Sequence, residues 1–75
     1  MELVKNKVSG KFFIVIDDAG ENYMNLITPE GRIKRLESHL FSTLTTSDYS
    51  EGKINADLTR AQMETYKEHS EYADF

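Results

Sequence analysis

The densest group of residues with chemical potential is an acidic turn beside a glycine. Asp17, Asp18 and Glu21 surround Gly20, and hard cations such as Ca²⁺ and Mg²⁺ prefer several carboxylate oxygens. An EF-hand loop, however, needs acids at alternate positions and a bidentate glutamate further along the chain, and this turn has neither. Asp, Asn and Gly are also the residues that turns themselves favour. We therefore predict a polar turn here and no metal site.

The remaining catalytic residue types are scattered. His39 and His69 are thirty residues apart, and the chain has no cysteine that could complete a zinc site. The four glycines are too dispersed for a phosphate-binding loop. A chain of 75 residues also leaves little room for a substrate pocket. We expect no catalytic residues and no cofactor, so the sequence predicts a protein that is not an enzyme.

Charge is unevenly distributed along the chain. Residues 1–37 carry six basic and six acidic residues, whereas residues 38–75 carry three basic and seven acidic ones, which accounts for the net charge of −4. The first half can therefore hold a local basic surface, although the overall acidity opposes phosphate binding. The residues of a possible nucleic-acid contact are Lys5, Lys7, Lys11, Arg32, Lys34 and Arg35. We expect the three lysines to lie near the other three residues if the first strand neighbours the hairpin made by Tyr23–Thr28 and Arg32–Leu36.

A second possible contact lies near the C-terminal end and consists of one methionine and three aromatic residues. Its residues are Met63, Tyr66, Tyr72 and Phe75, and they either cover the sheet or bind another protein. The acidic residues around them oppose the helix dipole at that end, so we expect the end to fray unless something binds it.

The elements that position these residues begin with a continuous apolar run. Phe12–Ile16 is five bulky residues in a row, which needs cover on both sides and is typical of a central strand. Thr28–Gly31, with Pro second and Gly fourth, predicts a type I turn inside a hairpin. The predicted strands are Leu3–Val8, Lys11–Asp17, Tyr23–Thr28, Arg32–Leu36 and Ser42–Thr46, with a helical or 3₁₀ turn over Glu37–Phe41.

A helix is predicted over Arg60–Tyr72. Thr59 is a good N-cap, and Gln62 three residues later completes a capping box. The stripe expected to face the sheet is Met63, Tyr66, Ser70 and Ala73.

We expect one domain over 1–75, made of a sheet (1–46), a loop (47–58) and a helix (59–73). The first residues contain no long apolar segment, so we expect no signal peptide, and no run of about 20 apolar residues predicts a membrane span. Absence of cysteine is compatible with the cytoplasm, which is the expected location.

The order of elements from Leu3 to Thr46 resembles a small SH3-like barrel, with Glu37–Phe41 as the helical turn before the last strand. The expected fold is mostly β: such an antiparallel barrel, or a curved meander of four to five strands, with a C-terminal helix. The functional hypothesis is a small interaction module that binds another protein or a second copy of itself. The alternative is a nucleic-acid-binding module that uses the basic residues; no membrane contact is expected.

Overall fold

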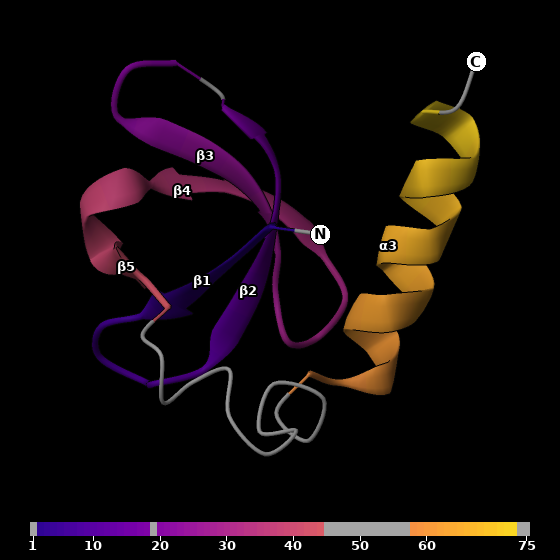
Figure 1. Ribbon diagram of the computed structural model, residues 1–75, viewed down its shortest axis with the longest axis horizontal. Helices are drawn as coiled ribbons and strands as arrows, with labels where there is room; N and C mark the ends of the chain where they lie inside the picture. The colour runs from indigo at the N-terminus through magenta and orange to yellow at the C-terminus, as the bar shows by residue number, and fades with distance from the viewer. Residues whose placement is uncertain (1, 19, 45–57, 74–75) are drawn as a thin grey trace.

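The protein is an antiparallel sheet followed by one helix. The computed structural model describes residues 2–18, 20–44 and 58–73 (Figure 1). Its strands are β1 (Glu2–Asn6), β2 (Phe12–Asp18), β3 (Tyr23–Ile27), β4 (Ile33–Glu37) and β5 (Phe41–Thr43), with a 3₁₀ turn η1 (Ser38–Leu40) and the helix α3 (Arg60–Ala73). The strand order is β4-β3-β2-β1-β5, so among the described strands the sheet is open and has β4 and β5 at its edges.

This architecture confirms the predicted mostly β class, and the open order corresponds to the curved meander. The first four predicted strands are found within two residues of their expected bounds. The last strand begins one residue earlier than predicted, at Phe41, and β5 ends at Thr43; Thr45 and Thr46 of the predicted strand lie outside the described residues. The predicted loop 47–58 lies, apart from Leu58, outside the described residues.

The apolar run occupies the centre of the sheet, as predicted. β2 lies between β1 and β3, and Phe12, Phe13, Ile14 and Val15 are all buried. Successive side chains of a strand point to opposite faces, so this run contributes to two separate apolar layers. One layer alone would leave half of the run in water.

The first layer is the main core. Val4, Phe13, Val15, Leu26 and Phe41 form one buried cluster, against which two half-buried residues of β3 and β4 pack. The rings of Phe13 and Phe41 meet edge to face with centroids 4.9 Å apart, a favourable aromatic geometry. This contact joins the centre of the sheet to its edge strand β5.

The second layer lies on the opposite face. Phe12, Ile14 and Ile27 are at most 1% exposed, and they alternate with the residues of the main core. The helix α3 stands on one side of the sheet, next to the loop between β3 and β4 (Figure 1). It reaches these strands through one buried side chain, which is described below.

The predicted turn after β3 is present. The Gly31 N–H donates to the Thr28 carbonyl at 2.8 Å, the bond that closes a four-residue turn. Gly31 has a φ of 83°, a left-handed conformation that glycine adopts without steric cost. The turn places Pro29 and Gly31 directly against the first two turns of α3.

Candidate protein-docking site on the C-terminal helix

The start of α3 is fixed by the predicted capping box. The Gln62 N–H donates to Thr59 Oγ1 at 3.1 Å, and the Thr59 N–H donates to Gln62 Oε1 at 3.0 Å. Each side chain thus satisfies a backbone donor that the helix itself leaves unpaired. The capping box therefore sets where the helix begins and how Gln62 is oriented.

Gln62 also connects the helix to the sheet. It is 0% exposed, and its Nε2 donates to the Phe12 carbonyl at 2.8 Å and to the Ile27 carbonyl at 3.2 Å. Continuing the β2–β3 register beyond Ile14↔Ile27 brings Phe12 opposite Pro29, which has no N–H to donate. The Gln62 amide supplies a donor where the strand ladder cannot. This role was missed from the sequence, because the capping box explained the residue without requiring its burial.

Two further hydrogen bonds hold α3 against the β3–β4 loop. Thr59 Oγ1 donates to the Pro29 carbonyl at 2.5 Å, and Thr65 Oγ1 donates to the Gly31 carbonyl at 2.6 Å. Ala61 approaches so closely that a Cβ added to Gly31 would lie 2.8 Å from the Ala61 carbonyl oxygen. The side of α3 that faces the sheet is therefore Ala61, Gln62 and Thr65.

The predicted inward stripe of the helix is wrong at Met63. This side chain is 41% exposed, and Tyr66 is half-buried; the side chains of Ser70 and Ala73 lie outside the described part. The reason is the close contact at Gly31, which requires small or hydrogen-bonding residues on the facing side. Successive helix residues are separated by about 100°, so placing Gln62 inward turns Met63 away from it.

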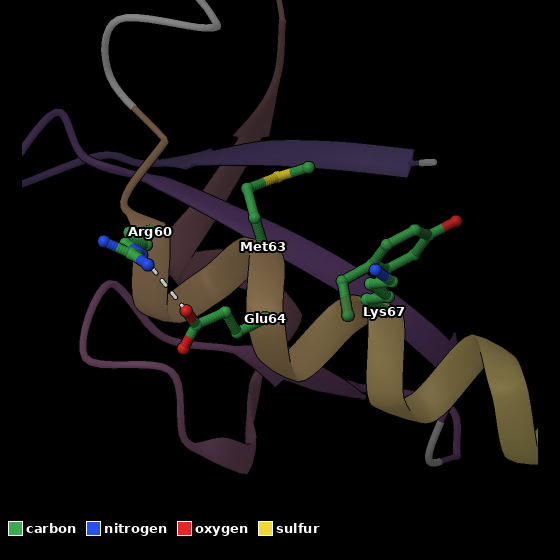
Figure 2. Close-up of a pocket in the computed structure, with 5 residues that line it drawn as sticks. Arg60, Met63, Glu64 and Lys67 are labelled. Carbon is green, nitrogen blue, oxygen red and sulfur yellow. Dashed lines mark hydrogen bonds and ion pairs between the residues drawn. The ribbon is translucent and has the colours of Figure 1, made fainter.

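The exposed side of α3 carries a shallow depression of about 450 Å³, which we call the helix groove. Its described lining residues are Arg60, Met63, Glu64, Tyr66 and Lys67. Figure 2 shows Met63 projecting away from the neighbouring ion pair between Arg60 and Glu64, whose Nε–Oε1 distance is 3.1 Å. The groove lining thus combines the large side chains of Met63 and Tyr66 with charged side chains of both signs.

The structure brings two of the four predicted protein-contact residues together. Met63 and Tyr66 lie three positions apart on α3 and both line the helix groove. Tyr72 belongs to the last turn of α3, but its side chain lies outside the described part, as does all of Phe75. Their contribution to the contact stays a prediction.

The six predicted nucleic-acid contacts fall into two groups. Lys5, Lys7 and Lys11 form a β1–β2 basic group, on β1 and around its turn to β2, whereas a β4 basic group contains Arg32, Lys34 and Arg35. The first strand does not neighbour the hairpin in the sheet order, because β2 lies between β1 and the β3–β4 hairpin. Arg35 lies over the Tyr23 ring at 4.9 Å, a cation–π contact within one side of the sheet. Nucleic-acid binding stays an untested prediction.

The other candidate residues make local contacts. Asp17 accepts a hydrogen bond of 2.6 Å from the Asn25 amide across β2 and β3, whose Cα register pairs the same residues. His39 contacts the Glu37 carboxylate at the exposed η1 turn. Within the described residues no group of three or more acidic or histidine side chains is placed to hold a metal ion.

Comparisons with protein-family models, with curated proteins and with solved structures found no match. The resemblance to SH3-like barrels therefore stays a prediction. In the part of the chain that the structure describes, no helix is long and apolar enough to cross a membrane.

Proposed function

We propose that this protein is a non-enzymatic interaction module that binds an amphipathic helix of a partner protein in the helix groove. The observation that carries the proposal is Met63, a large apolar residue that is 41% exposed and lines a depression together with the charged residues Arg60, Glu64 and Lys67. A cytoplasmic location, compatible with a chain that has no cysteine, is part of the same proposal.

The way in which α3 is anchored supports this use. Ala61, Gln62 and Thr65 hold one side of the first two turns to the sheet, which leaves the opposite side accessible over the same turns. A helix fixed in this manner presents its outer side chains in a defined orientation. Binding then costs little ordering entropy on this side of the complex.

The spacing of the groove residues favours a helical partner. Met63, Tyr66 and Lys67 lie at relative positions 0, +3 and +4, so they form one row along the helix surface. A partner helix recognises such a row by apolar residues at the same spacing, flanked by polar ones. Glu64 and Lys67, which also line the groove, can pair with partner charges of the opposite sign.

The contribution of Met63 to the binding free energy follows from its exposure. Complete burial of a methionine side chain contributes about 1.5–3 kcal/mol, and with 41% of the side chain still exposed roughly 1 kcal/mol is available to a partner. Met63→Glu forfeits this contribution and also buries a charge without a fixed partner. We expect the dissociation constant to rise at least tenfold, or about 1.4 kcal/mol.

The test is a quantitative affinity enrichment with three proteins: the native chain, Met63→Glu and Val8→Glu. The control makes the same kind of change at a side chain that is 93% exposed in the β1–β2 turn, far along the chain from the groove. A partner retained by the native chain and by Val8→Glu, but lost with Met63→Glu, supports the proposal. Equal retention by both variants contradicts it, as does failure of any protein to exceed a tag-only control. Unchanged melting temperatures verify that both variants fold.

A further inference from the structure

The strand β4 presents an open edge. Among the described strands it pairs only with β3. Two hydrogen bonds bracket this pairing: the Thr28 N–H donates to the Arg32 carbonyl, and the Ser38 N–H donates to the Asn22 carbonyl, both at 2.8 Å. Bonded and non-bonded pairs alternate along antiparallel strands, so every second residue of β4 directs its N–H and C=O outward. The outward residues are Ile33, Arg35 and Glu37.

Four of the five side chains along this edge are exposed, and two of these four are basic. Ile33 is 52% exposed and adds an apolar side chain to this edge. Lys34 and Arg35 are also exposed and lie on opposite faces of the sheet. The Tyr23 ring under Arg35 limits where its guanidinium can lie. The edge therefore offers backbone partners, an apolar contact and two positive charges within three consecutive residues.

We propose that the β4 edge binds an extended segment of another protein, antiparallel to β4, which carries two adjacent acidic residues between two apolar ones. Strand addition satisfies the outward backbone groups, and neighbouring side chains give the specificity. The residue opposite Ile33 is apolar, and those opposite Lys34 and Arg35 are acidic. The residue opposite Leu36, which is half-buried, is again apolar.

In the register that overlaps all of β4, charge argues against a second copy of this chain as the occupant. An antiparallel pair of β4 strands centred on Arg35 places the two Arg35 side chains directly opposite each other, and like charges at that position are destabilising. It also places Lys34 against Leu36 of the other copy. An acidic segment meets neither conflict, so a different protein is the better occupant.

The first experiment titrates the isotope-labelled protein with the capped peptide Lys-Val-Glu-Glu-Val. In the proposed register its residues lie opposite Glu37, Leu36, Arg35, Lys34 and Ile33 in that order. We expect saturable amide shifts centred on β4 and slower hydrogen exchange at its outward N–H groups. The peptide with Lys-Lys in place of Glu-Glu, and the acidic peptide N-methylated at its third and fifth residues, should bind at least tenfold more weakly. Equal binding by either control peptide, or no shift on β4, overturns the proposal.

The second experiment reverses one charge on the protein. Arg35→Glu should weaken the acidic peptide roughly tenfold and improve binding of the Lys-Lys peptide, because opposite charges then face each other. Lys11→Glu makes the same change at an exposed site outside β4 and should alter neither affinity. If both variants weaken the acidic peptide equally, the attraction is a general charge effect and the site is refuted.

The two surfaces are distinguished by the same peptide. Met63→Glu, which tests the helix groove, should leave peptide binding at β4 unchanged. Concentration-dependent sedimentation of the native chain, abolished by Arg35→Glu, would instead identify a second copy at the edge and overturn the choice of partner.

Discussion

Replacing Gln62 by methionine tests how the helix is held to the sheet. Methionine has nearly the same length as glutamine and favours helix, but it offers no strong hydrogen-bond donor or acceptor. The substitution therefore removes the polar contacts of a fully buried side chain while largely preserving its volume. Gln62→Met therefore tests the hydrogen bonds of Gln62 separately from its packing.

The expected loss in the free energy of unfolding follows from three hydrogen bonds. Gln62 donates to the Phe12 carbonyl at 2.8 Å, donates to the Ile27 carbonyl at 3.2 Å and accepts from the Thr59 N–H at 3.0 Å. At about 1 kcal/mol each, their loss totals about 3 kcal/mol. The Phe12 carbonyl lies opposite Pro29, which has no N–H, so no neighbouring backbone donor can replace the lost Gln62 amide. Greater apolar burial by methionine offsets about 1 kcal/mol, so we expect a net loss of about 2 kcal/mol.

The assay is urea unfolding followed by far-ultraviolet circular dichroism. Gln62→Met should lower the midpoint with an unchanged m-value, which reports a loss of stability without a change in the surface exposed. The control is Glu64→Met, which introduces the same residue on the exposed side of α3. It loses only the surface pair with Arg60 and should cost at most about 0.5 kcal/mol. An equal loss in the free energy of unfolding for the two variants would refute the role of Gln62 in holding α3 to the sheet.

Three further predictions concern the loop, the core and the basic residues. Gly31→Ala should cost about 1–3 kcal/mol more than Gly10→Ala in urea unfolding, because both glycines have positive φ but only Gly31 contacts α3; equal costs would contradict the close contact. Phe41→Ala should lose about 3–5 kcal/mol, whereas Val8→Ala should stay within about 0.5 kcal/mol, and a small effect of Phe41→Ala would contradict its place in the core. In a low-salt titration with single- and double-stranded oligonucleotides, the amide signals of the β1–β2 and β4 basic groups should not shift with one common dissociation constant. Shifts in both groups with the same, strongly salt-dependent dissociation constant would contradict the separation of the two groups in the sheet.

The parts of the fold that the sequence predicts are those decided by local chemistry. The apolar run Phe12–Ile16 requires cover on both faces, and the structure places it in the central strand. Thr28–Gly31 has the residues of a tight turn, and Thr59 with Gln62 has those of a capping box, and both are present. Each of these features depends on neighbours within a few residues, so a single sequence contains the relevant information.

The helix groove depends instead on contacts that are distant along the chain. The orientation of α3 follows from Gln62 reaching Phe12, fifty residues away, and from Ala61 meeting Gly31. Helical periodicity alone favoured Met63 as the inward residue, because it is apolar and Gln62 is not. The burial of the Gln62 amide is explained by the strand register, which puts Pro29 opposite Phe12. This register cannot be read from the sequence.

The same limit applies to the basic residues. Alternation along Ile33–Glu37 is readable from the sequence, and the register with β3 agrees with it. Which strand lies next to which is a property of the whole sheet, so the distance between the two basic groups could not be predicted. The exposed position of Ile33 follows from β4 being an edge, which the sheet order alone establishes.

The most direct test of the proposed function is the dissociation constant of a purified partner, measured by calorimetry with the native chain, Met63→Glu and Val8→Glu. We expect a dissociation constant at least tenfold higher for Met63→Glu and an unchanged value for Val8→Glu, with all three proteins folded. A partner that binds Met63→Glu as tightly as the native chain would contradict the assignment of the helix groove as the docking site.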